Sequence, residues 1–350
     1  MSSIAYSGPI EHVVVVMLAR RSYDDGLGAL YDAANAEPYD AAPGAQRKLD
    51  GAGARGFRPP AIPVTAYLAR QFMVCDRWFA SSPRRGAANL LFAHCAADGD
   101  AALEPNVFSA LDATRPPHAD GARWKIYFHD DSLVGRALPY VARCWSDPAN
   151  GNLANYDEVD YPPGRENVLA RPTTTFLQDV AQNRLPAYAF VEPRRGMRRS
   201  PVSLGSERPA EGAFDLVADP FDDEALVCEV YLALRTSAYW ERSLLLVVYG
   251  ESDASADHVA PPAGWGGRVP AIVVSPYVEP GSILRADAPF EHASIVKTLW
   301  QCFDLRRSRA PHATARDERA PSLLDHLATR VVNRPAAGLD LGDLLTVASR

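Results

Sequence analysis

Charged and hydroxyl side chains follow an apolar run near the beginning of the chain. The stretch "HVVVVMLARRSYDDGLG" passes from four valines to Arg20, Arg21, Ser22 and Tyr23, and then to two aspartates. Guanidinium groups bind phosphate, sulfate and carboxylate through paired hydrogen bonds, and hydroxyl groups can add further hydrogen bonds. We expect these four side chains to bind a ligand. The alternative is that Arg20 pairs with a nearby carboxylate, either Asp24 or Glu251.

Carboxylate and imidazole groups occur near two later apolar segments. Glu251, Asp257 and His258 follow the apolar run 244–249, and His292 begins a helical pattern. Groups of these types can act as general acids and bases when their pKa lies near neutral pH. The sequence predicts acid–base catalysis by these four side chains. The alternative is a structural role in which Asp257 and His258 only hydrogen-bond the backbone of their loop.

Glu192 is a further candidate because it directly follows the apolar run 188–191. We expect it to accept hydrogen bonds from a ligand, or else to pair with Arg194.

Five apolar runs bounded by turn residues are typical of strands that are buried on both faces. These runs lie at Val13–Leu18, Trp124–Phe128, Tyr188–Val191, Leu244–Tyr249 and Ala271–Val274. Helical patterns alternate with them, at Val64–Gln71, Thr174–Gln182, Asp223–Thr236 and His292–Phe303. This order predicts an α/β fold with a doubly wound, mostly parallel sheet and helices on both faces. Ligands bind beyond the carboxyl ends of such strands, so the candidate residues are expected to meet there.

Long stretches rich in proline, glycine and alanine separate some of these elements. They span 37–63, 98–122, 144–172 and 194–220. Ordinary connections are shorter, so we predict irregular insertions that cover the site. The chain is predicted to form a single domain over 1–350. Its tail, 305–350, is predicted to pack on that domain or to be partly irregular, with a short helix at "SLLDHL".

Composition excludes several classes of protein. The 350 residues carry a net charge of −7, which gives no general attraction to nucleic acid. No apolar run is long enough to span a membrane, and no export signal is recognisable at the beginning of the chain. The five cysteines are scattered without metal-binding spacing. We therefore predict a cytoplasmic protein with reduced thiols, without nucleic-acid or membrane partners.

Successive blocks of the sequence resemble the bacterial phosphoesterase family. The similar blocks run from about residue 9 to about residue 330, namely "PIEHVVVVMLARRSYDDGLG", "QFMVCDRWFASSPRRGAANLLFAH", "WKIYFHD", "LPAYAFVEPR", "VYGESDASADHVAPP", "RVPAIVVSPYV" and "PFEHASIVKTLW". This family includes nonspecific phospholipases C and acid phosphatases. The resemblance implies an alkaline-phosphatase-like α/β fold and hydrolysis of phosphate esters with the help of a divalent cation.

The chain departs from the family at the positions that carry this chemistry. The resemblance places Ala19 and Arg20 where the family has a Glu and an Asn as metal ligands. It places Gly86 at the nucleophile, Gly250 at a further ligand and Ala218 at a histidine. Alanine and glycine side chains have no donor atom, and arginine carries a fixed positive charge. We therefore predict no metal site, no cofactor and no hydrolysis by the family's route.

Other residues at the same place retain or add polar groups. Asn89 matches an Asn of the family, and Arg84 and Arg85 bring guanidinium groups towards the position of the metal. We expect Arg85, Asn89 and Arg20 to bind an anionic small molecule, unless Arg84 and Arg85 are only solvated loop residues.

Three functions agree with this pattern. The first is a repurposed, metal-independent enzyme that acts on an anionic small molecule by acid–base chemistry. The second is a catalytically inactive member that serves as a binding or scaffold protein. The third is a residual phosphoesterase with a rebuilt site. We favour the first because new functional side chains accompany the losses.

Overall fold

The structure is a computed structural model. It describes residues 6–28, 62–84, 87–97, 105–114, 122–129, 132–146, 152–155, 175–193, 220–252, 257, 259–284, 286–305 and 316–335.

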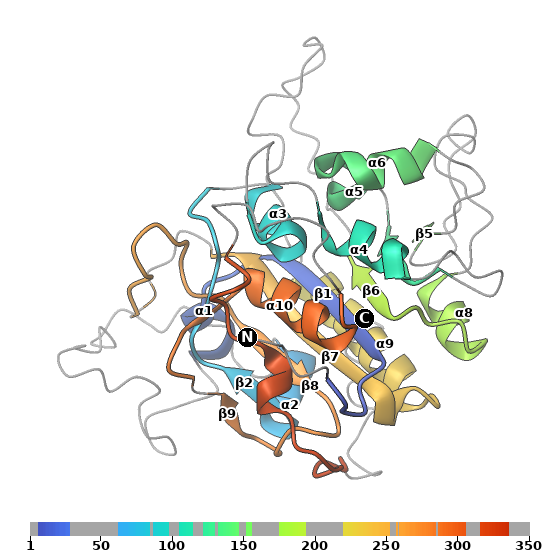
Figure 1. Ribbon diagram of the computed structural model, residues 1–350. Coiled ribbons are helices and arrows are strands. Elements are labelled where there is room, and N and C mark those ends of the chain that lie inside the picture. Colours follow the sequence, from blue (N-terminus) through green and yellow to red (C-terminus); the bar gives the residue numbers. More distant parts are fainter. Residues whose placement is uncertain are drawn as a thin grey trace.

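An eight-stranded sheet forms the centre of the molecule (Figure 1). Its order is β5-β4-β6-β1-β7-β8-β2-β9. The strands span Leu153–Asn155 (β5), Trp124–Phe128 (β4), Tyr188–Val191 (β6), His12–Arg20 (β1), Ser243–Glu251 (β7), Ala271–Val274 (β8), Met73–Cys75 (β2) and Ile283–Leu284 (β9). The pairs from β5 to β7 are parallel, whereas β8 runs antiparallel to both of its neighbours. The prediction of a mostly parallel sheet is confirmed.

β1 lies between β6 and β7, and its sequence explains this central position. The side chains from Val13 to Leu18 are at most 4% exposed. Branched valines pack well on both faces of a pleated strand that helices cover on either side. The register places Arg20 beside Glu251, so β1 and β7 end together.

Two groups of helices cover the sheet (Figure 1). On one face α3 packs against α4, α5 and α10, and α6 packs against α4 and α5. On the other face α9 contacts α2 and α8. The helices span Ala87–Cys95 (α3), Val107–Thr114 (α4), Leu133–Ala137 (α5), Pro139–Ser146 (α6), Ala293–Cys302 (α10), Pro63–Gln71 (α2), Phe176–Ala181 (α8) and Pro220–Arg235 (α9). A helix of five residues, α1 (Tyr23–Leu27), follows β1.

Local sequence signals set the beginnings of the helices. Thr175 and Gln178 form a capping box at α8, in which each side chain binds the other residue's backbone N–H. Pro63 begins α2, where its missing N–H costs nothing. The Glu224 carboxylate of α9 accepts hydrogen bonds from the N–H groups of Val64 (2.6 Å) and Thr65 (3.1 Å). It therefore supplies the cap that the sequence of α2 lacks.

The predicted elements agree with the structure except within the long connections. All five predicted strands form, and the four predicted helices form with ends that shift by up to three residues. The stretches 98–122 and 144–172 were expected to be irregular, but the first contains α4 and the second contains β5. Both elements are short, which is why their periodicity is weak. Most of the other two stretches, 37–63 and 194–220, lies outside the described residues.

The described part of the tail packs against the sheet and helices. The guanidinium of Arg316 pairs with Glu291 at 2.7 Å and lies over the rings of Phe92 and Trp265. A 3-10 helix, η5 (Leu323–His326), forms at the predicted short helix and packs against α10. Glu291 belongs to β10 (Phe290–Glu291), which pairs with β3 (Trp78–Phe79).

Two general properties can be stated for the described part of the chain. The five cysteines are free thiols. No helix there combines the length and the apolar character needed to cross a membrane.

Candidate functional site

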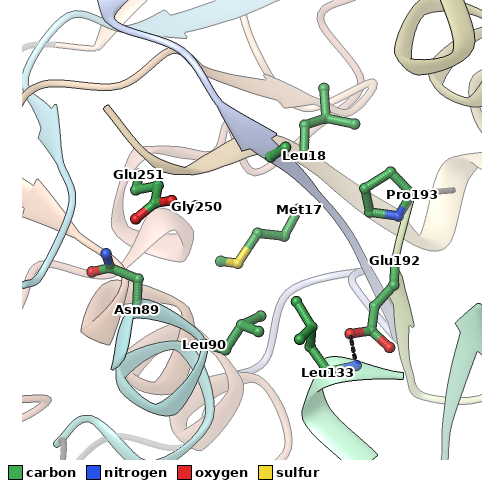
Figure 2. Close-up of a pocket in the computed structure, with 10 residues that line it drawn as sticks. Met17, Leu18, Asn89, Leu90, Leu133, Glu192, Pro193, Gly250 and Glu251 are labelled. Atoms are coloured by element: carbon green, nitrogen blue, oxygen red, sulfur yellow. Dashed lines mark hydrogen bonds between the residues drawn. The ribbon is translucent and has the colours of Figure 1, made fainter. Parts of the chain in front are cut away.

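A small pocket lies where β6, β1 and β7 end, between these strands and helices α3 and α5 (Figure 2). Its walls are mostly apolar, and its polar groups are two carboxylates and one carboxamide. The lining residues are Met17, Leu18, Ala19, Asn89, Leu90, Leu133, Glu192, Pro193, Gly250 and Glu251. Ala19 and Gly250, at which the resemblance placed metal ligands of the family, thus lie in one pocket. Three of the predicted site residues also line it: Glu251, Asn89 and Glu192.

Arg20 forms an ion pair with Glu251 at the end of the two central strands. Their Nε and Oε1 atoms are 3.6 Å apart, and the side chains are 18% and 15% exposed. Neighbouring residues in register on parallel strands direct their side chains to the same face, which brings this pair together. Of the two carboxylates proposed as partners of Arg20, Glu251 is the one it pairs with here. Anion binding by Arg20 stays a prediction.

Arg21 follows β1 and has its contacts elsewhere. Its side chain is buried, and the guanidinium carbon lies 5.1 Å from the ring centroid of Tyr249. Burial raises the pKa of Glu224, and the positive charge of Arg21 partly opposes this rise. Because Glu224 belongs to α9, on the face opposite α3, these contacts lie away from the pocket. A role of Arg21 in ligand binding stays a prediction.

Ser22 and Tyr23 form the beginning of α1. The Ser22 hydroxyl accepts a hydrogen bond from the N–H of Asp25, which makes it the N-cap of the helix. The Tyr23 ring is buried beneath the guanidinium of Arg268, whose central carbon lies 4.1 Å from the ring centroid. Both residues therefore support the fold at this point, and ligand binding by them stays a prediction.

An ion cluster around the buried Arg268 joins α1, which follows β1, to the loop after β7. The Arg268 side chain is completely buried, and its Nη2 atom lies 3.1 Å from Asp24 Oδ1 and 2.9 Å from Asp257 Oδ1. Its Nη1 donates to the carbonyl of Asp76 at 3.1 Å. Two carboxylates and a π-face surround the guanidinium, so its positive charge is compensated inside the protein.

Asp257 also organises its own surroundings. It accepts hydrogen bonds from the N–H groups of Asp24 (3.3 Å) and Val259 (2.9 Å). Burial raises its pKa, although the positive charge of Arg268 opposes the rise. These contacts agree with the structural alternative for Asp257. Catalysis by Asp257 remains a prediction.

His292 is completely buried and has both ring nitrogens in hydrogen bonds. Trp78 Nε1 donates to Nδ1 (3.2 Å), so Nε2 carries the proton and donates to the carbonyl of Gly250 (2.8 Å). Burial lowers its pKa from 6.5 to about 4. The ring is thus neutral at pH 7 and its proton is held by backbone, an arrangement that connects α10 to the end of β7. Catalysis by His292 stays a prediction.

Asn89 and Glu192 line the pocket while holding parts of the backbone. The carboxamide of Asn89 accepts from the N–H of Ser82 (2.8 Å) and donates to its carbonyl (3.1 Å). Glu192 Oε1 accepts from the N–H groups of Leu133 (2.8 Å) and Val134 (3.2 Å) at the beginning of α5, as Figure 2 shows for Leu133. Arg194, the other partner expected for Glu192, lies outside the described residues.

Several predicted positions cannot be placed. His258, Arg85, Gly86 and Ala218 lie outside the described residues, so their predicted roles stay predictions.

The side chains of the pocket do not fit the divalent cation that the family resemblance implies. Hard cations such as Mg²⁺ and Ca²⁺ bind several oxygen ligands around one point. Ala19 and Gly250 offer no side-chain donor, and the Arg20 guanidinium lies against Glu251. Within the described ranges, no group of three or more His, Cys, Asp or Glu side chains is arranged to hold a metal ion.

Sequence reasoning missed Arg268 and the apolar side chains of the pocket. Arg268 directly precedes a buried apolar run, and a buried arginine needs carboxylate partners. The acidic residues at 24 and 257 were therefore the available signal. The apolar lining could not be recognised, because Leu90 and Leu133 do not differ in sequence from core residues.

Comparison with known proteins identifies the family. Residues 45–306 match the Phosphoesterase family. The chain is 28% identical over 301 residues to "Non-specific phospholipase C6" of Arabidopsis thaliana, covering 79% of this chain and 54% of that protein. It is 26% identical over 285 residues to "Phospholipase C A" of Mycobacterium tuberculosis (strain ATCC 25618 / H37Rv), covering 68% and 50%. The chain thus spans about half the length of these curated relatives.

A solved structure agrees with the fold. It is a protein in the alkaline phosphatase superfamily from Vibrio parahaemolyticus, which covers 90% of this chain and 71% of its own with a TM-score of 0.50. At 11% sequence identity this likeness shows the fold alone. The fold therefore agrees with the family match, which covers three quarters of the sequence, and this chain belongs to the phosphoesterase family.

Proposed function

We propose that this chain is a binding member of the phosphoesterase family that does not hydrolyse phosphate esters with the family's metal. The observation that carries the proposal is the ion pair between Arg20 and Glu251 at the pocket. A guanidinium and its partner carboxylate stand where the resemblance implies metal ligands. The guanidinium already offsets part of the charge of Glu251, and Ala19 and Gly250 of the lining have no side-chain oxygen, so a dication lacks the several oxygen ligands it needs.

The neighbouring polar groups support a binding role rather than catalysis. Arg268 holds Asp257, and the proton of His292 is donated to the carbonyl of Gly250. A general acid or base must be able to exchange its proton with a substrate. These two candidates instead make their hydrogen bonds to other groups of the protein.

A second candidate function is metal-independent acid–base catalysis, which we favoured from the sequence. One observation supports it: Glu251 lines the pocket and is partly exposed. In this function Glu251 acts as the general acid or base, and the Arg20 guanidinium stabilises the negative charge of its carboxylate.

Hydrolysis assays test both functions. The substrates are p-nitrophenyl phosphate and phosphatidylcholine in detergent micelles, because the relatives are named phospholipases C. Wild type and Glu251→Gln are assayed with added Mg²⁺, Ca²⁺, Mn²⁺ or Zn²⁺, and with a chelator. We expect equal background rates under all conditions.

The two contrary results differ from each other. Turnover that requires a metal and disappears with the chelator contradicts the proposal. Turnover that is insensitive to the chelator and is lost in Glu251→Gln supports the second function instead. A matched control, Glu279→Gln, replaces an exposed glutamate beyond β8 and should behave as the wild type.

A further inference from the structure

We propose that the pocket takes a small organic cation, an ammonium group on a short apolar body. This inference rests on the proposed function, because it names the ligand class of the same pocket. It replaces the anionic ligand that we expected from the sequence.

The charged side chains that line the pocket are negative. Two of the ten lining residues are charged, and both are carboxylates, Glu192 and Glu251. No lysine, arginine or histidine among the described residues lines the pocket. Arg20 stands beside it, but its guanidinium is directed at Glu251. An anion entering the pocket would face two carboxylates, whereas a cation would be attracted by Glu192 and, more weakly, by Glu251, whose charge Arg20 partly offsets.

The two carboxylates of the pocket lie at the ends of different strands. Glu192 directly follows β6, and Glu251 is the last residue of β7. The Met17 side chain of the central strand β1 lies between them (Figure 2). An ammonium group does not need several oxygen ligands around one point, as a divalent metal ion does. An ammonium group can approach either carboxylate while its carbon chain contacts the methionine.

The walls of the pocket are mostly apolar. Met17, Leu18, Leu90, Leu133 and Pro193 offer hydrocarbon surface that inorganic ions cannot use. Pockets of this composition favour organic ligands whose few polar groups are matched by a few fixed partners. Glu192 is a fixed partner, since the backbone of α5 holds its Oε1 atom. The methionine is flexible and can adjust to the ligand.

A series of ligands with one hydrocarbon chain and different charge tests the proposal. Butylammonium, butanol and butyrate are compared by calorimetry and thermal shift at constant ionic strength, together with inorganic phosphate and MgCl₂. The short chain suits the small pocket. We expect butylammonium to bind at least about tenfold more tightly than butanol, and the other three to leave the melting temperature unchanged. This comparison uses wild type and needs no variant.

Two variants then give opposite results. Glu251→Gln should weaken butylammonium binding by about tenfold, and Arg20→Gln should strengthen it, because it removes a competing positive charge from Glu251. The control Glu279→Gln should bind as the wild type does. Binding of an anionic small molecule by Arg20, as expected from the sequence, predicts the reverse: phosphate or butyrate binds, and Arg20→Gln abolishes this binding.

Ligand binding tests the inference, and metal-dependent hydrolysis tests the proposed function. Stabilisation by phosphate or butyrate, by Mg²⁺, or by none of the probes overturns the inference. If butylammonium binds and metal-dependent hydrolysis also occurs, the proposed function fails while the inference stands. If neither occurs, the inference fails and the absence of metal-dependent hydrolysis stands.

Discussion

His292 makes the stability of this chain depend on pH in a defined range. Its buried ring is neutral in the folded protein because burial lowers its pKa from 6.5 to about 4. The unfolded chain binds a proton as the pH falls below 6.5, whereas the folded protein does so only near pH 4. The stabilisation is therefore complete above pH 6.5 and is lost as the pH falls from 6.5 towards 4.

The size of the effect follows from the two pKa values. A fall from 6.5 to about 4 corresponds to about 3 kcal/mol when integrated over the whole range, of which about 2 kcal/mol is lost between pH 7 and pH 5. His94 has its pKa lowered to the same value, also by burial, and contributes a similar loss. Burial raises the pKa of Glu291, which has the opposite effect on stability at low pH.

The perturbation that isolates His292 is His292→Gln. A glutamine amide can still donate to the carbonyl of Gly250, but it cannot titrate. The free energy of unfolding is measured by urea titration with tryptophan fluorescence at pH 7 and at pH 5. We expect the variant to be less stable at pH 7, because the hydrogen bond from Trp78 is lost. Between the two pH values it should lose about 2 kcal/mol less than wild type.

The difference between wild type and variant cancels the contributions of all other titrating groups. His326→Gln is a matched control, because its ring is only half buried and should contribute less. If His292→Gln loses as much stability between pH 7 and pH 5 as wild type, His292 is not held neutral by the fold. His292 would then again be a candidate for acid–base catalysis.

Two further predictions concern the buried charges and the glycines near the site. Arg268→Met leaves the buried Asp257 carboxylate without its cation, so we expect the free energy of unfolding to fall by about 3 to 5 kcal/mol. The double variant Arg268→Met with Asp257→Asn should recover part of this loss. No recovery would show that lost packing, and not the unpaired charge, causes the destabilisation. Gly250→Ala should fold with a melting temperature near that of wild type, because a Cβ there meets its nearest neighbour, a backbone oxygen, at an ordinary 3.4 Å. Gly266→Ala should be strongly destabilised, because its Cβ would lie 2.5 Å from the Ser82 carbonyl oxygen; equal melting temperatures of the two variants would contradict this.

The sequence by itself determined the central strands and the helices that cover them. Runs such as 188–191 are apolar at every position, and such runs form strands only when helices cover both faces. The sequence also predicted one edge of the sheet for the site, because the carboxyl ends of parallel strands share that edge. Ala19 lines one pocket with Gly250 and Glu251, although it lies more than 200 residues from them in the sequence.

Only the tertiary structure decided which polar groups face the pocket and which hold the fold. Arg20 and Arg21 are adjacent in sequence, yet one meets Glu251 at the pocket and the other lies buried against Tyr249. The partner of a charged side chain comes from a distant segment, so the residue type alone cannot assign its role. For the same reason the sequence could not tell that Arg268 holds Asp257, because burial and pairing of charges are properties of the assembled chain.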